Sequence, residues 1–144
     1  MPVPERSARG GWRFACVRGC TLCCRQPGFV YLTEQDVRRA ARRLGLSARE
    51  FERRYVYRTP YTLRLRKPRR AACHFLSDSG CLLHPAKPTQ CRLYPFWPEI
   101  LEEPGGWRRE ADFCPGIGRG PRLTPRTVRR RLAAMKRAYP AQYS

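Results

Sequence analysis

Apolar residues recur at helical spacing on one face of the segment that follows Thr33. That face consists of Val37, Ala40, Ala41 and Leu44. The opposite face consists of Arg38, Arg39, Arg42 and Arg43. Thr33 and Asp36 have the three-residue separation of a capping box, and Gly45 favours a helix end. The pattern therefore predicts an amphipathic helix from Thr33 to about Leu44.

Two more helices are indicated by the same kind of signal. Ser47 and Glu50 repeat the start pattern, which predicts a short helix over Ala48–Tyr55. Near the end of the chain, Thr124 suits a helix cap and Pro125 suits the first helical position. The apolar stripe of this segment consists of Val128, Leu132, Met135 and Tyr139. We expect one basic amphipathic helix there.

Strand signals lie between these helices. Residues 61–66 alternate between apolar and polar types, which predicts a half-buried strand with Tyr61 and two leucines on its buried side. A second strand is expected over residues 71–76. The Ser-Asp-Ser-Gly sequence at 77–80 then predicts a turn into residues 81–83.

Prolines interrupt the segment that follows the turn. They are Pro85, Pro88, Pro95 and Pro98. Because proline lacks a backbone N–H and fixes φ, we expect no long helix or strand here. Residues 102–106 are expected to form a surface loop, and residues 107–113 a strand.

These elements predict an α+β fold, a small irregular single domain organised around a cysteine metal cluster and ending in a helix. We expect a flexible lead-in at residues 1–13 and a cysteine-cluster domain at residues 14–121. Residues 122–144 would form the C-terminal basic helix, packed on the same domain. The length of 144 residues fits one domain and excludes a (β/α)₈ barrel.

The charge of the chain is strongly one-sided, with 30 Lys and Arg against 11 Asp and Glu, a formal net charge of +19. Such a balance favours anionic partners, either a nucleic acid or an acidic protein. The sequence contains no apolar stretch of about 18 residues that would span a membrane. Its first 13 residues lack the pattern of a secretory signal, so we expect a cytoplasmic protein with reduced thiols.

Eight cysteines are the main chemical signal. They are Cys16, Cys20, Cys23, Cys24, Cys73, Cys81, Cys91 and Cys114. Thiolates three or four residues apart converge on one ion with little chain to order, and as soft ligands they select zinc, iron–sulfur clusters or Cu(I). All eight are candidate ligands, and which of them share a site is left open. His74 and His84 are weaker candidates.

The spacing Cys16-x3-Cys20-x2-Cys23 also occurs in radical SAM enzymes, but this chain is too short for their partial barrel. A more specific signal is the run Pro88-Thr-Gln-Cys-Arg-Leu-Tyr-Pro-Phe96, followed by Cys-Pro-Gly at 114–116. Together with the first four cysteines, these motifs closely resemble the YkgJ-type cysteine-cluster family, a zinc- or iron-chelating domain. The resemblance covers about residues 16–116 and implies metal binding by the cysteines, with zinc, iron or an iron–sulfur cluster as the cofactor.

The motif also suggests residues that support the ligands. Arg92, beside Cys91, is expected to offset the negative charge of thiolates. Tyr94 and Phe96 are expected to form an apolar cover that limits access of solvent, although a role as plain core residues fits them equally.

Three functions are compatible with these features. The first is a metal-chelating protein with no assigned catalysis. The second is a basic nucleic-acid-binding module stapled by zinc. The third is an iron–sulfur-dependent protein-modifying enzyme, suggested by similar motifs in the larger flagellin lysine methylases. The sequence shows no triad, paired carboxylates or cofactor fingerprint, so no reaction and no catalytic residue are predicted.

Overall fold

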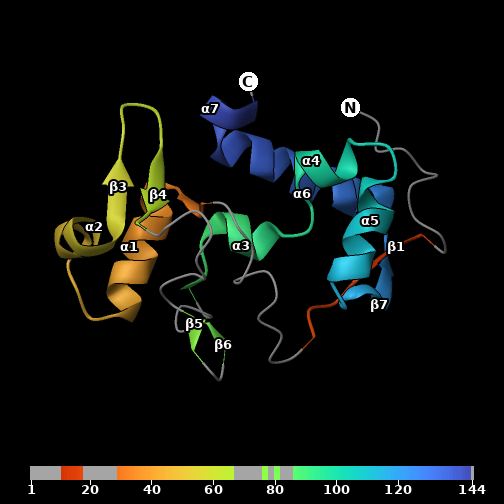
Figure 1. Cartoon of the computed structure of the whole chain (residues 1–144), viewed down its shortest axis with the longest axis horizontal. Helices are drawn as coiled ribbons and strands as arrows, with labels where there is room; N and C mark the ends of the chain where they lie inside the picture. Colours follow the sequence, from red (N-terminus) through yellow and green to blue (C-terminus); the bar gives the residue numbers. More distant parts are fainter. Residues whose placement is uncertain (1–10, 18–28, 67–75, 78–79, 82–85, 144) are drawn as a thin grey trace. The chain divides into compact units, whose positions relative to one another are not determined.

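The computed structural model describes residues 11–17, 29–66, 76–77, 80–81 and 86–143 (Figure 1). Helices and short antiparallel strands are mixed along the chain, which confirms the predicted α+β class and its C-terminal helix. Two compact units emerge: Met1–Cys20 together with Leu93–Ser144, called unit 1, and Thr21–Arg92, called unit 2.

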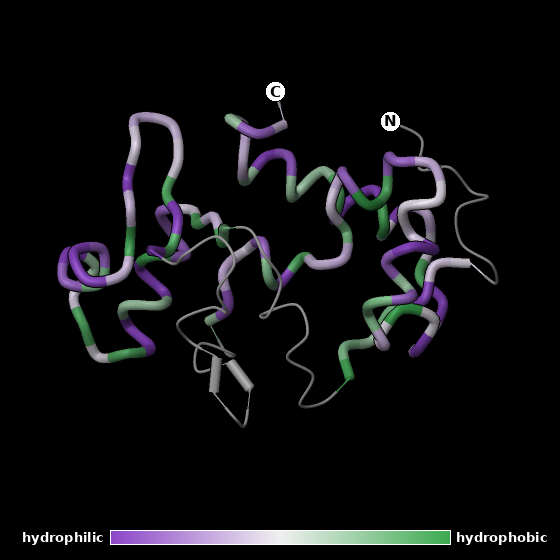
Figure 2. Tube along the Cα trace, in the orientation of Figure 1, coloured by the Kyte–Doolittle hydropathy of each residue, from purple (hydrophilic) through white to green (hydrophobic). Residues whose placement is uncertain are grey.

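Unit 2 combines two helices with a three-stranded sheet. The strands are β2 (Tyr31–Leu32), β3 (Val56–Arg58) and β4 (Leu63–Leu65), antiparallel in the order β2-β4-β3. The helices are α1 (Glu34–Arg43) and α2 (Ala48–Tyr55). Their apolar faces and the sheet share a buried core, formed by Leu32, Val37, Ala40, Ala41, Phe51, Val56, Leu63 and Leu65. Figure 2 shows hydrophobic and hydrophilic residues alternating along these elements.

The caps predicted from the sequence form as expected. The Thr33 side chain accepts a hydrogen bond from the Asp36 backbone N–H, and the Asp36 side chain accepts one from the Thr33 N–H. Ser47 caps α2 through the N–H of Glu50 at 3.0 Å. Gly45 follows α1 with φ of 71°, a conformation that glycine adopts without a steric cost. Both helix predictions are confirmed.

The strand predicted over residues 61–66 is shorter than expected. Only Leu63–Leu65 is extended, and Tyr61, expected on the buried side, is 83% exposed. The reason is a turn held by Thr59, whose Oγ1 accepts hydrogen bonds from the backbone N–H groups of Tyr61 and Thr62. Tyr61 therefore lies in this turn, and the strand begins only after it, at Leu63.

The rest of unit 2 is built from short elements. Strands β5 (Leu76–Ser77) and β6 (Gly80–Cys81) pair antiparallel, as the predicted turn requires. The expected strand over residues 71–76 lies outside the described residues except for its last position. Helix α3 (Thr89–Leu93) has five residues and α4 (Pro98–Leu101) has four, in agreement with the interruption by prolines.

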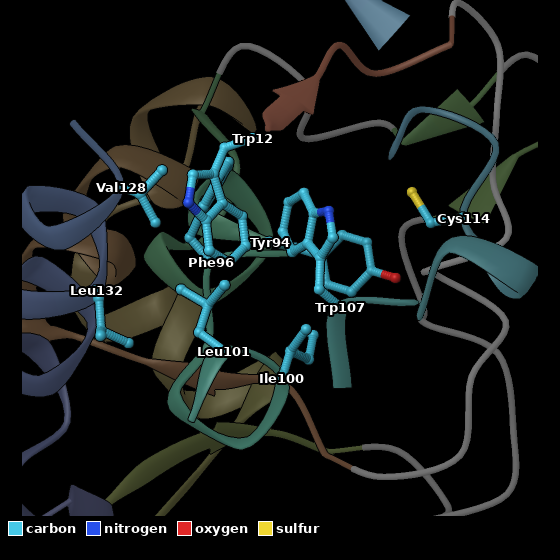
Figure 3. Close-up of a cluster of buried hydrophobic side chains, with 9 residues drawn as sticks. All are labelled: Trp12, Tyr94, Phe96, Ile100, Leu101, Trp107, Cys114, Val128 and Leu132. Atoms are coloured by element: carbon cyan, nitrogen blue, oxygen red, sulfur yellow. The ribbon is translucent and has the colours of Figure 1, made fainter. Parts of the chain in front are cut away.

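Unit 1 is built on an antiparallel pair of strands, β1 (Trp12–Phe14) and β7 (Ile117–Leu123). Strand β1 begins inside the segment expected as a lead-in, and β7 crosses the expected boundary between residues 121 and 122. Helices α4, α5 (Gly106–Phe113), α6 (Pro125–Ala138) and α7 (Pro140–Tyr143) complete the unit. Its core consists of Trp12, Tyr94, Phe96, Ile100, Leu101, Trp107, Cys114, Val128 and Leu132 (Figure 3).

Residues 107–113, predicted as a strand, form helix α5 instead. Its inward positions are Trp107, Glu110 and, just past its end, Cys114, which follow the three-to-four-residue period of a helix. Glu110 is satisfied inside by the hydroxyl of Tyr94, a contact that the sequence pattern does not reveal. The prediction was wrong because this polar inward position hides the helical period.

The predicted C-terminal helix is confirmed as α6. The Thr124 side chain accepts a hydrogen bond from the N–H of Thr127, and Pro125 occupies the first turn. The apolar stripe is buried at Val128, Leu132 and Met135. Helix α6 is therefore held on unit 1 by packing of one face.

Candidate metal centre

Two candidate ligands, Cys16 and Cys114, lie at the same end of the β1–β7 pair. Phe14 is paired with Ile117, and the N–H of Ala15 donates to the Gly116 carbonyl at 3.0 Å. Cys16 is the next residue after Ala15, and Cys114 precedes Gly116 by two. The backbone therefore brings together two segments whose cysteines are 98 positions apart in the sequence.

The glycine of the Cys-Pro-Gly motif permits this close approach. A Cβ atom at Gly116 would lie 2.5 Å from the Ala15 carbonyl oxygen and 3.0 Å from the Phe14 ring. Such separations are shorter than van der Waals contact, so any larger residue would push the two strands apart. Gly116 thus fixes the spacing between the segments that carry Cys16 and Cys114.

The two thiols of unit 1 have different surroundings. Cys114 follows the last residue of α5, where its N–H donates to the Glu110 carbonyl at 2.7 Å. It is 8% exposed and lies at one end of the core, on the side away from Val128 and Leu132 (Figure 3). Cys16 is exposed to solvent. One ligand would therefore be anchored in the core, while the other lies on the surface segment.

In unit 2, Cys91 lies in the middle of α3 and is half-buried. The first residue of this helix, Thr89, is tied to the buried carboxylate of Asp36 on α1. The backbone N–H of Thr89 donates to Oδ2 at 2.9 Å, and its hydroxyl donates to Oδ1 at 2.8 Å. This pair of bonds connects the capping box of one helix to the start of the helix that carries Cys91.

Asp36 is only 1% exposed and accepts four hydrogen bonds from described residues. Besides the two from Thr89, it receives the N–H of Thr33 at 2.9 Å and the guanidinium of Arg39 at 2.5 Å. A buried carboxylate is stable only when its charge and its lone pairs are satisfied, and these donors satisfy both. We call Asp36, Thr33, Arg39 and Thr89 the Asp36 network.

Gln90 adds a second attachment for α3. Its Oε1 accepts the backbone N–H of Tyr31 at 3.0 Å, and its Nε2 donates to the Phe29 carbonyl at 3.2 Å. Strand β2, which contains Tyr31, is an edge strand of the sheet, so the amide side chain supplies bonds that a neighbouring strand would otherwise make. Thr89 and Gln90 together fix the position of the backbone at Cys91.

The three expected supporting residues occupy different places. Arg92 is exposed, and its guanidinium lies 3.4 Å from the Thr89 hydroxyl. Tyr94 is buried and donates its hydroxyl hydrogen bond to Glu110. Phe96 is 1% exposed and packs edge to face on Phe14, with ring centroids 5.8 Å apart. Tyr94 and Phe96 are therefore core residues of unit 1, in the same core as Cys114.

The remaining candidate ligands lie largely outside the described part of the chain. Cys20, Cys23, Cys24 and Cys73 are outside it, as are His74 and His84. Cys81 is described only as part of the backbone of β6. Within the described residues, no group of three or more Cys, His, Asp or Glu side chains is arranged to hold a metal ion.

Three residues that matter for the arrangement were not predicted as part of the site: Asp36 in its contact with α3, Thr89 and Gln90. Asp36 is recognised from the sequence only as a capping residue. Thr89 and Gln90 immediately precede Cys91 within the most distinctive motif of the chain, and that position was the available signal. Their partners lie 53 to 61 residues away, beyond what local patterns can reveal.

One known protein family matches most of the chain. The CxxCxxCC family model, described as "Putative zinc- or iron-chelating domain", matches residues 15–115. The chain belongs to this family. The matched range of the CxxCxxCC domain spans all eight cysteines and both attachments of α3. No solved structure matches the chain.

The side chains of this CxxCxxCC domain suit a soft metal. Thiol sulfur is the common donor, and Asp36, an acidic side chain in contact with the motif, accepts hydrogen bonds from N–H and O–H donors. Thiolate donors favour zinc, iron or an iron–sulfur cluster over calcium or magnesium, which prefer oxygen. Among the described helices, none is both long and apolar enough to cross a membrane.

Proposed function

We propose that this CxxCxxCC domain binds zinc or iron, the latter as an ion or as an iron–sulfur cluster, through its cysteine thiolates. The observation that carries the proposal is the close approach, at Gly116, of the two backbone segments that carry Cys16 and Cys114 at one end of the β1–β7 pair. If Cys114 were only a buried core residue, there would be no reason for the segment beside it to carry the exposed thiol of Cys16.

The chain prepares its ligands in two ways. In unit 1, the paired strands and Gly116 set the separation of two thiol-bearing segments. In unit 2, the Asp36 network and Gln90 hold the backbone of Cys91. Ligands held in place before binding lose less conformational freedom when they bind, so affinity rises. When bound, zinc would supply a structural cross-link, and an iron–sulfur cluster would supply one-electron redox chemistry.

The positive charge of the protein supports the same function. A site with four thiolates and one divalent ion has a formal charge of −2, and a net charge of +19 favours such an anionic centre. Arg92 is the cation nearest to Cys91 in the sequence, and its exposed guanidinium remains available to offset thiolate charge. We therefore assign Arg92 an electrostatic role beside the site.

The test is metal analysis and an ultraviolet–visible spectrum of protein purified without oxygen. We expect stoichiometric zinc in a colourless protein, or iron with absorption near about 400 nm in a brown one. Replacing Cys16, Cys91 or Cys114 by serine should lower the metal content. Val128→Thr is the control, because it disturbs the same core as Cys114 without removing a thiol. Metal content unchanged in all three cysteine variants, or lost equally in the control, would contradict the proposal.

A further inference from the structure

Helix α6 presents four arginines on the side opposite its buried stripe. They are Arg126, Arg129, Arg130 and Arg137, and all four are exposed. We call them the α6 arginine face. The buried stripe, with Val128 and Met135 almost fully enclosed, fixes this face toward solvent. None of its four residues is a candidate metal ligand.

No nearby acid explains these cations. Residues 113–144 contain eight Lys and Arg and not a single Asp or Glu. On α6 itself, Lys136 pairs with Glu102 at 2.8 Å, and the Arg131 guanidinium lies 4.9 Å from the centroid of the Phe96 ring. In the part of the chain that the structure describes, the four residues of the α6 arginine face form no ion pair.

Most arginines of α1 and α2 are accounted for by the fold, although the exposed Arg38 and Arg49 form no ion pair among the described residues. On α1, Arg39 is bound to Asp36, and Arg42 and Arg43 lie in the last turn, where the helix dipole favours cations. On α2, the two arginines of the last turn both pair with Glu50.

On α6, cations occupy the first half of the helix as well as its last turn. Arg126, Arg129 and Arg130 lie in the first half of the helix, and its first turn contains no acid. Arg126, in the first turn, opposes the helix dipole, and like charges three or four residues apart, as Arg129 and Arg130 are from Arg126, repel each other. The α6 arginine face therefore lowers the stability of the helix that carries it. An anionic partner would relieve both effects.

The chemistry of the face selects the class of partner. A membrane-binding amphipathic helix inserts its apolar stripe, but here that stripe is buried in unit 1. The exposed side offers guanidinium groups without an aromatic side chain to anchor a protein partner. Guanidinium binds phosphate in a bidentate manner. From Arg126 to Arg137 the face extends roughly 16 Å, which matches about five phosphates along one strand of a duplex.

We propose that the α6 arginine face binds the phosphate backbone of a nucleic acid. Such contacts carry no sequence information, so the binding is expected to be insensitive to base sequence and steeply dependent on salt. Each phosphate contact adds about −0.9 to the slope of log K against log salt, so every contact makes the salt dependence steeper. Between 50 and 200 mM salt, the fold-decrease in affinity should therefore be about 40 times smaller in a variant that has lost three contacts than in the wild type.

The experiment measures binding of the full, metal-loaded protein to a labelled duplex of random sequence by fluorescence anisotropy across this salt range. The test variant replaces Arg126, Arg129 and Arg130 by glutamine. The control variant replaces Arg38, Arg42 and Arg43 on α1 by glutamine and removes the same charge from another exposed helix surface. In the test variant, we expect the slope of log K against log salt to become less steep by about two to three, at about 0.9 for each lost contact. In the control, it should change by less than about one.

The outcomes separate the possible partners. Equal slope changes in both variants would show that net charge alone drives binding, and would overturn the proposal. A wild-type protein that binds vesicles containing phosphatidylserine and does not bind the duplex would overturn it in favour of a membrane surface. Circular dichroism shows whether each variant stays folded, and we expect it to, because all six replaced side chains are exposed.

Discussion

Replacing Thr89 by valine removes one hydroxyl from the Asp36 network and leaves the side-chain volume almost unchanged. The lost bond is the one from Thr89 Oγ1 to Asp36 Oδ1, at 2.8 Å in a buried position. The backbone N–H of Thr89 still donates to Oδ2 at 2.9 Å. The variant therefore loosens the start of α3 without deleting it.

The magnitude follows from the charge and burial of Asp36. A hydrogen bond to a charged group contributes about 1.5–3 kcal/mol. Because three other donors to Asp36 remain, we expect the lower part of this range, about 1.5–2 kcal/mol, as a decrease in the free energy of unfolding. If α3 positions Cys91 for the metal, the same loss weakens metal binding about tenfold or more, since about 1.4 kcal/mol corresponds to a factor of ten.

The assay has two parts, denaturant unfolding of the metal-free protein and competition for metal with a chromophoric chelator. Ser47→Ala is the matched control, because Ser47 caps α2 in the same unit and its loss costs about 1 kcal/mol. We expect Thr89→Val to lower both stability and metal affinity, and Ser47→Ala to lower stability alone. An unchanged metal affinity in Thr89→Val, despite reduced stability, would refute the positioning role of the Asp36 network.

Two further predictions concern unit 1. Gly116→Ala should lower its stability by about 1–3 kcal/mol and reduce metal content, because the new Cβ would lie 2.5 Å from the Ala15 carbonyl; a melting temperature and metal content equal to wild type would contradict this. Burial raises the pKa of Glu99 above its ordinary 4.5 despite the hydrogen bond from Tyr143, so ionisation of Glu99 destabilises the folded state as pH rises through that pKa. Thermal melts should show Glu99→Gln more stable than wild type at pH 7, with the difference gone below about pH 4; a difference independent of pH would contradict the reasoning.

The helices that could be predicted are those whose signals are local. Thr33 with Asp36, and Ser47 with Glu50, are separated by three residues and act on the backbone beside them. Thr124 at the start of α6 belongs to the same class. Such a cap is a hydrogen bond between residues a few positions apart, so the short sequence pattern is enough to predict it.

Elements that depend on distant partners were not predictable in this way. Strands β1 and β7 are short, and β7 contains exposed residues at most positions, so neither shows an alternating pattern before the two pair. The sequence of helix α5 does not show a helical period because Glu110, a polar residue, occupies an inward position, where it accepts a hydrogen bond from the Tyr94 hydroxyl. In each case the deciding contact joins segments far apart in the sequence.

The candidate site also has one part that local sequence predicts and another that depends on contacts between distant residues. Cysteine spacing identifies thiol chemistry from the sequence alone, because the choice of ligand atom depends on residue type. The placement of Cys16 and Cys114 at the same end of the β1–β7 pair depends instead on the register of the two strands. The attachment of Cys91 depends on Asp36, whose capping role is local while its contact with Thr89 spans 53 residues.

The most direct test of the central claim is X-ray absorption at the edge of the metal that the protein contains when purified without oxygen. If cysteine thiolates bind the metal, the first coordination shell consists mainly of sulfur, at about 2.3 Å for zinc. This shell should lose sulfur in Cys114→Ser. A first shell made only of nitrogen and oxygen, at about 2.0–2.2 Å, would contradict the account.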